Sequence, residues 1–142
     1  MTKILTKSRN LVGWGIRHIT FVDYGRVSHS NPVRQSLFTY EDALNGGRPK
    51  AIAAAENLSK IQPSIVSEGH HINIPMPGHY TDPSKLATAL EEVKKIDQLV
   101  QEHDAVFLLL DTREARWLGT LLSAAHNKVK QNQNNLNPEE KL

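Results

Sequence analysis

The feature that most constrains the fold is a run of six apolar residues, Ala105–Leu110 (AVFLLL), which ends abruptly at Asp111. A short continuous apolar run is typical of a strand in the middle of a parallel sheet, because such a strand is covered on both faces. We therefore predict a central parallel strand here, with helices packed on both faces of its sheet.

Strand and helix patterns alternate along the rest of the chain. Arg17–Asp23 (RHITFVD) and Ile65–Ile74 carry β-branched residues or alternate in polarity, and both predict strands. Apolar residues at helical spacing, with proline near the start or glycine at the end, predict helices. One helix is expected to end at residue 13 or 15, and others to cover residues 49–61, 83–103 and 113–125. This alternation indicates a Rossmann-like α/β fold, a parallel sheet with flanking helices.

The Rossmann-like pattern is incomplete at its N-terminal side. In nucleotide-binding domains a first strand and a glycine-rich loop precede an acid such as Asp23 by about 20–25 residues. Residues 1–9 contain neither. From His126 onward the chain is rich in Asn, Gln and charge, so we expect residues 126–142 to form a disordered polar tail. The ordered domain is therefore expected to span residues 10–125.

Composition excludes several classes of function. The 142 residues include no cysteine, which excludes disulfides, iron–sulfur clusters, cysteine zinc ligands and a cysteine nucleophile within this chain. The formal net charge is only +2 and the basic residues are scattered, which argues against nucleic-acid binding. No run of about 18 apolar residues and no signal-peptide pattern is present, so we expect no membrane span and a cytoplasmic protein.

Acidic residues follow two of the predicted strands, where ligands bind in parallel sheets, so we expect them to converge at one edge of the sheet. Asp23 ends the first recognisable strand, the place where nucleotide-binding domains hold the ribose hydroxyls with an acid. The alternative is a turn-initiating or helix-capping aspartate. Asp111 can bind Mg²⁺ through its carboxylate or cap the helix that begins at Arg113, and these two roles are compatible.

Amide and cationic side chains lie in two further segments. Asn31, Arg34 and Gln35 share one short turn (SNPVRQ), where an amide and a guanidinium can donate to phosphate oxygens; the alternative is a solvated loop. Lys50 follows two glycines at a helix start, where the helix dipole favours an anion, or it is simply an exposed lysine. The segment GGRPK is not a Walker motif, because it lacks the spacing and the Ser or Thr after the lysine.

Taken together, these segments resemble the adenylation domain of the autophagy E1-like activating enzymes over roughly residues 10–125. SNPVRQ and GGRPK are shared in looser form with ubiquitin E1 enzymes and bacterial sulfur-carrier adenylyltransferases. IPMPGH and DTREARW are specific to the autophagy branch. The resemblance is carried by residues 11–35 (LVGWGIRHITFVDYGRVSHSNPVRQ), 46–50 (GGRPK), 74–79 (IPMPGH) and 106–117 (VFLLLDTREARW).

The resemblance implies an enzyme of autophagosome formation that uses ATP and Mg²⁺ to adenylate the C-terminal glycine of autophagy ubiquitin-like modifiers. In that family a cysteine then takes the modifier as a thioester, and E2-like enzymes receive it. The full-length family is expected to form homodimers and to act in the cytoplasm, including at the pre-autophagosomal structure.

The same resemblance implies a role for each candidate residue. Asp23 would bind the ribose of ATP, and Asp111 would engage Mg²⁺. Three residues would hold the phosphates, namely Asn31, Arg34 and Lys50. Arg34 would also act in catalysis, and Gln35 would help to order its loop. Gly25 stands where many E1-like relatives carry a second acid.

The chain also departs from the pattern of the family at both ends. The first strand and glycine-rich loop of the family should precede Asn10, and further strands and a catalytic cysteine should follow Ala125. We therefore expect a shortened chain that cannot complete the reaction alone. The alternative is a non-catalytic module for binding or dimerisation.

Overall fold

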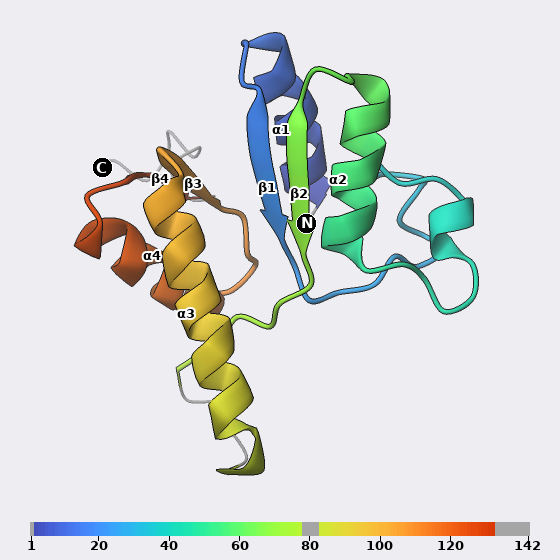
Figure 1. The fold of residues 1–142 in the computed structure, drawn as a ribbon. Coiled ribbons are helices and arrows are strands. Elements are labelled where there is room, and N and C mark those ends of the chain that lie inside the picture. The colour runs from blue at the N-terminus through green and yellow to red at the C-terminus, as the bar shows by residue number, and fades with distance from the viewer. Residues whose placement is uncertain (1, 78–82, 133–142) are drawn as a thin grey trace, which may run out of the picture. The chain divides into compact units, whose positions relative to one another are not determined.

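The computed structural model describes residues 2–77 and 83–132. The chain divides into two compact units, Met1–Asn73 and Ile74–Leu142, called here the first and second units. Within each unit two parallel strands are joined through a helix, and Figure 1 shows the two strand pairs with their helices. The architecture is α/β with parallel strands and flanking helices, which confirms the predicted fold class.

The first unit is built on the parallel pair β1–β2, in which His18 lies opposite Val66 and Val22 opposite His70. The long connection between β1 and α2 contains one short 3-10 helix, η1. The elements of the first unit are α1 Thr2–Gly13, β1 His18–Val22, the 3-10 helix η1 Glu41–Ala43, α2 Lys50–Ile61 and β2 Val66–His70.

The core of the first unit lies between this sheet and α2. Phe21 of β1 is buried, and Ile19, two residues earlier on the same side of the strand, packs against the same cluster. The buried side of α2 is lined mainly by alanine, which lets the helix come close to the sheet. A Cβ atom at Gly69 of β2 would overlap the backbone of Ala51. The core residues are Phe21, Val27, Leu37, Phe38, Ala43, Ala51, Ala53, Ala54, Ala55, Leu58 and Ile65.

The second unit is built on the parallel pair β3–β4, with Ala105 opposite Val129 and Leu108 opposite Asn132. Helix α4 packs on β3, since a Cβ atom at Gly119 would lie 2.5 Å from Leu108 Cδ2. The elements of the second unit are the 3-10 helix η2 Pro83–Lys85, α3 Leu86–Glu102, β3 Ala105–Leu108, α4 Arg113–Ala125 and β4 Val129–Asn132.

The predicted central strand differs from the one observed. Strand β3 covers only Ala105–Leu108, and in the described part of the chain it pairs with β4 alone. Phe107 is 40% exposed, whereas Leu108 and Leu109 are buried. Among the described residues the strands form two parallel pairs, β1–β2 in the first unit and β3–β4 in the second. The expectation of a strand covered on both faces was therefore wrong.

The predicted start of the disordered tail was also wrong. Residues 129–132 form β4, and the segment before it is anchored to α3. His126 Nε2 lies 2.7 Å from Asp97 Oδ1, and Lys128 donates a 2.8 Å hydrogen bond to the carbonyl of Gln101. A strand is held by main-chain hydrogen bonds, so a polar segment can form one beside an open strand. Residues 133–142 lie outside the described residues.

Pro83 begins the 3-10 turn η2 and the α-helix itself begins at Leu86, later than predicted, while Asp82 lies outside the described residues. Among the residues that the structure describes, no helix is long and apolar enough to cross a membrane.

Candidate functional site

Asp23 lies at the carboxyl end of β1, beside the end of β2. Its backbone N–H donates to the carbonyl of His70 at 3.2 Å, so the two strand ends are joined there. Its carboxylate Oδ1 accepts a 2.6 Å hydrogen bond from the backbone N–H of Gly25. The carboxylate is half-buried. It therefore initiates a turn at the carboxyl end of the strand, as the alternative interpretation expected, and its contact with a ribose stays a prediction.

Lys50, the first residue of α2, meets Asp23 at Gly25. The backbone N–H of Lys50 donates to the carbonyl of Gly25 at 2.9 Å. A Cβ atom at Gly25 would lie 3.0 Å from Asp23 Oδ1 and 3.4 Å from Lys50 Cδ. Gly25 thus leaves room for a carboxylate and an ammonium group to share one corner of the first unit.

The electrostatics of this corner are set by burial. Burial raises the pKa of Asp23 above its ordinary value; the hydrogen bond from Gly25 and the positive charges of Lys50 and His71 offset this only in part. His71 also stacks on Tyr24, with ring centroids 5.2 Å apart and an interplanar angle of 13°. Asp23 is therefore a hydrogen-bond acceptor held in a partly buried environment with the Lys50 ammonium nearby.

A glycine turn brings Lys50 to this position. Gly46 and Gly47 have φ values of 82° and 77°, a region that side chains other than glycine rarely adopt. The loop after β1 then pairs with the segment after the turn. Val27 N–H donates to the carbonyl of Arg48 at 2.9 Å, and the Arg26 guanidinium donates to that of Gly47 at 2.7 Å. The two glycines are thus required for the path of the chain into α2.

The predicted phosphate loop is organised by Asn31. Its Oδ1 accepts from the N–H of Ser28 at 3.0 Å, and its carbonyl accepts from the N–H groups of Arg34 and Gln35. Asn31 and Gln35 are buried, at 4% and 2% exposure, whereas Arg34 is exposed. Gln35 Oε1 is buried without a hydrogen-bond partner among the described residues. Two of the three residues are thus built into the loop, and Arg34 is its accessible cation.

Asp111 lies in the second unit, three residues after the end of β3, and its side chain is exposed. The cap of α4 is Thr112, whose Oγ1 accepts from the N–H of Ala115 at 3.2 Å. The alternative role of Asp111 as the helix cap is therefore wrong. Because Asp23 and Asp111 belong to different units, their convergence on one site stays a prediction.

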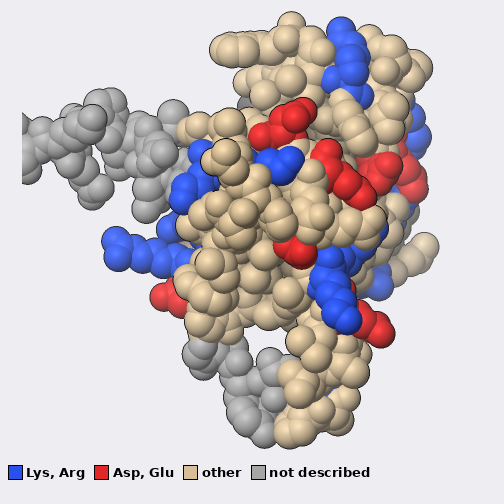
Figure 2. Space-filling model, turned by 60° about the vertical axis from the view of Figure 1, so that its left-hand side comes forward, with Lys and Arg blue, Asp and Glu red and all other residues tan. Residues whose placement is uncertain are grey.

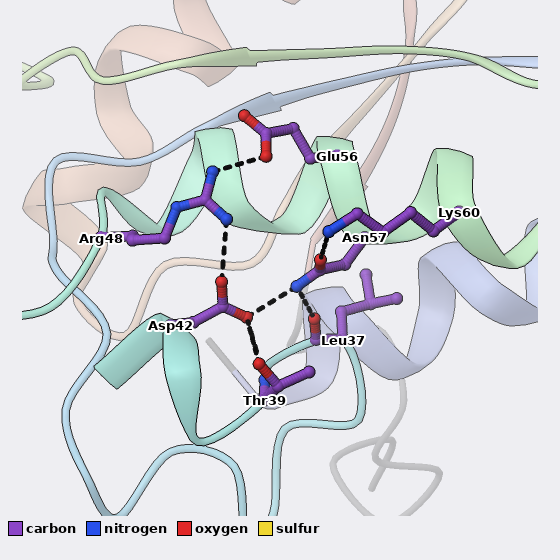
Figure 3. Close-up of polar contacts among 7 residues, drawn as sticks. All are labelled: Leu37, Thr39, Asp42, Arg48, Glu56, Asn57 and Lys60. Carbon is purple, nitrogen blue, oxygen red and sulfur yellow. Dashed lines mark hydrogen bonds and ion pairs between the residues drawn. The ribbon is translucent and has the colours of Figure 1, made fainter. Parts of the chain in front are cut away.

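One buried cluster lies next to the site and was missed in the sequence. Figure 3 shows Asp42 of η1 bonded to Thr39, Arg48 and Asn57. The signal that could have revealed it is Asn57, a polar residue on the apolar side of α2. Buried polar side chains need hydrogen-bond partners, so Asn57 predicts a partner packed against this helix.

Both signs of charge occur side by side on the surface, as on the face drawn in Figure 2. With a formal net charge of only +2, the overall field of the protein is weak. The overall field therefore does not by itself select a site for an anion.

Comparison with known proteins identifies the family. The family model described as the ThiF family matches residues 7–131, which extends past the domain end expected at residue 125. The chain is 56% identical over 126 residues to "Ubiquitin-like modifier-activating enzyme ATG7" of Gibberella zeae. It is 52% and 51% identical over 124 residues to the proteins of that name from Gallus gallus and Homo sapiens.

These matches cover 86–88% of this chain but only 18% of each relative. The range matched by the family model contains every predicted site residue, the pair β1–β2, and the pair β3–β4 up to Gln131. The chain therefore belongs to the ThiF family.

Proposed function

We propose that this chain supplies the ATP-binding part of an adenylation site that activates the C-terminal glycine of an autophagy ubiquitin-like modifier. The observation that carries the proposal is the meeting of the Asp23 carboxylate and the Lys50 side chain at Gly25. A nucleotide needs acceptors for its ribose hydroxyls and cations for its phosphates, and this corner offers one of each. Identities of 51–56% to activating enzymes support the assignment.

The first unit offers three groups for the phosphates. Lys50 and Arg34 place positive charge where negative charge grows on the α-phosphate as the terminal carboxylate of the modifier attacks and pyrophosphate leaves. Asn31 uses its Oδ1 within the loop, so its amide nitrogen is the part that can donate to a phosphate oxygen. Gln35, which is buried, would keep the loop in shape.

The second unit would contribute the metal ligand. Mg²⁺, when bound, neutralises phosphate charge and prefers carboxylate, phosphate and water oxygens. The exposed carboxylate of Asp111, which is not used as the helix cap, fits that chemistry. We propose that it engages Mg²⁺ directly or through water.

The proposed partners follow from the same family. They are the autophagy ubiquitin-like modifiers and the E2-like enzymes, with a homodimer of the full-length enzyme in the cytoplasm and at the pre-autophagosomal structure. Because the chain has no cysteine, no modifier thioester can form on it.

The direct test of the proposal is ATP–pyrophosphate exchange together with calorimetric titration of Mg²⁺·ATP. We expect the chain to bind Mg²⁺·ATP, and Lys50→Ala or Arg34→Ala to weaken binding about tenfold, the effect of losing one charge-assisted contact of about 1.4 kcal/mol. Lys94→Ala removes the same charge from an exposed position in the second unit and should leave binding unchanged.

Exchange assays with a purified autophagy modifier then test catalysis. Any exchange that depends on the modifier should be abolished by the double variant Arg34→Ala, Asp111→Ala. Wild-type chain that is folded but binds no Mg²⁺·ATP would refute the proposal and favour a non-catalytic binding module.

A further inference from the structure

A buried carboxylate that the proposed reaction does not use lies beside the nucleotide corner. Asp42 is 3% exposed and accepts hydrogen bonds at both oxygens. Its Oδ2 accepts from the N–H of Thr39 at 2.9 Å and from the Asn57 amide at 2.7 Å, and its Oδ1 accepts from the Arg48 guanidinium at 3.0 Å (Figure 3). Asp42 therefore joins the 3-10 helix η1 to α2 and to the segment just before α2.

Arg48 is bonded to Asp42 through its main chain as well as its side chain. Its backbone N–H donates to the carbonyl of Asp42 at 2.8 Å. Another nitrogen of its guanidinium pairs with Glu56, which lies on α2 and is half-exposed. The carbonyl of Arg48 accepts from the N–H of Val27, so this residue is held on three sides.

Arg48 is two residues before Lys50, and the glycine turn is directly before Arg48. Gly46 and Gly47 can adopt many backbone conformations, so the turn alone does not define where α2 begins. Because Arg48 is anchored, the backbone from Arg48 through Pro49 to Lys50 has a defined path, and the N–H of Lys50 donates to the carbonyl of Gly25. The buried anchor and the nucleotide corner are thus two ends of one short rigid segment.

We infer that Asp42 is a positioning residue for the proposed phosphate site, acting through Arg48 to place the Lys50 ammonium beside Asp23. The inference rests on the proposed function in one respect, that Lys50 contacts a phosphate. Its structural part, that Asp42 determines the position of Lys50, does not depend on a nucleotide. The two parts are tested separately.

The first experiment uses the full chain without nucleotide. In amide NMR spectra we expect Asp42→Asn to shift the signals of Gly47, Arg48, Lys50 and Gly25, because the anchor of that segment loses its charge. Glu56→Gln is the matched control: it removes a charge from the other partner of Arg48 and should leave the signals of Lys50 and Gly25 in place. Shifts confined to Thr39 and Asn57 would overturn the inference.

If Asp42→Asn does not fold, Arg48→Lys replaces it in the same experiment. Lysine keeps the positive charge but cannot bind Asp42 and Glu56 with one planar fork. The same signals of Lys50 and Gly25 should move, and unchanged signals would contradict a positioning role.

The second experiment is a double-mutant cycle on Mg²⁺·ATP binding. We expect Asp42→Asn to weaken binding about fivefold or more in the wild-type background but less than about twofold in a Lys50→Ala background, because it acts through Lys50. Equal factors in both backgrounds would show that Asp42 only stabilises the fold. Wild-type chain that fails to bind Mg²⁺·ATP would refute the proposed function, while the NMR result would still decide the structural part.

Discussion

A Cβ atom at Gly47 would overlap the backbone carbonyl of Val27, whereas a Cβ atom at Gly46 would meet no atom within 4 Å. Both glycines have positive φ values. Glycine is therefore required at the two positions for different reasons. At Gly46 only the positive φ value favours glycine, whereas at Gly47 a side chain would also overlap the neighbouring backbone. At Gly47 the loop after β1 and the segment before α2 come into contact.

The first prediction compares alanine at these two glycines. Gly46→Ala should lower the free energy of unfolding by about 1 kcal/mol, the cost of a left-handed backbone for an L-residue. Gly47→Ala should cost more than about 3 kcal/mol, because the backbone of Val27 must also move. Urea unfolding of the two variants tests this, and equal losses would contradict the close approach.

The second prediction concerns Asp23 and pH. Its pKa is higher in the folded chain than the ordinary value of 3.8, so the free energy of unfolding falls as pH rises from 3.8 through the folded pKa. At pH 7 the ionised carboxylate is a destabilising group. Asp23→Asn keeps an acceptor for the N–H of Gly25 and removes the charge. We expect it to be at least as stable as the wild type at pH 7, with the difference shrinking toward pH 3.

Urea unfolding at the two pH values measures this difference. The same variant should bind Mg²⁺·ATP less tightly, since the amide is a weaker acceptor for ribose hydroxyls than a carboxylate. A variant that is less stable than the wild type at pH 7 would show that the charge of Asp23 supports the fold.

The third prediction concerns Asp42, whose pKa shifts in the opposite direction. Burial by itself would raise the pKa of Asp42, but the hydrogen bonds from Thr39, Asn57 and Arg48, with the charge of Arg48, together lower it below 3.8. Its stabilisation is therefore present above pH 3.8 and is lost as pH falls through the folded pKa. Asp42→Asn should cost about 2–3 kcal/mol at pH 7, because an amide cannot accept from all these donors.

Unfolding of wild type and Asp42→Asn between pH 2 and 7 tests the sign. The difference in stability between them should shrink as the pH falls below 3.8. Glu56→Gln serves as the control: its half-exposed ion pair with Arg48 should contribute less than about 1 kcal/mol. A constant difference between wild type and Asp42→Asn over the whole pH range would contradict the role assigned to this carboxylate.

The fourth prediction tests β4 by hydrogen exchange. Amides of Val129–Asn132 that donate to β3 should exchange more slowly than those of an unstructured peptide, since pairing must open before they exchange. Lys128→Ala removes the contact with the carbonyl of Gln101 and should speed this exchange by loosening the start of the strand. Exchange at the unstructured rate in the wild type would show that β4 is not paired in solution.

Local patterns were enough to predict most elements. Residues 49–61 have proline at the start and apolar residues at helical spacing, and α2 covers Lys50–Ile61. The strand expected at Arg17–Asp23 is β1, and the acid at its end lies at the edge where ligands bind. The corner formed by Asp23 and Lys50 could also be expected, because strand ends and helix starts lie on the same side of a parallel sheet. The helices and strands follow from patterns among residues close in the chain, and the corner follows from the way a helix connects two parallel strands.

Other features could not be predicted because they depend on long-range contacts. Asp42 and Asn57 are 15 residues apart and neither belongs to a recognisable motif. The strand β4 has a polar sequence, and only the open side of β3 selects it for pairing. The burial of Asn31 and Gln35, beside an exposed Arg34, also depends on how the loop folds back on itself.

The sequence by itself determined the α/β class, the order of the main strands and helices, the family, and which residue types are proposed to contact a nucleotide. Those properties follow from the periodicity of apolar residues, from the positions of glycine and proline, and from local sequence motifs. Only the tertiary structure decided that a buried aspartate holds the segment before Lys50, that Thr112 rather than Asp111 caps α4, and that residues 129–132 pair with β3. The physical reason is that hydrogen-bond partners and burial are properties of the folded chain, which local sequence patterns do not encode.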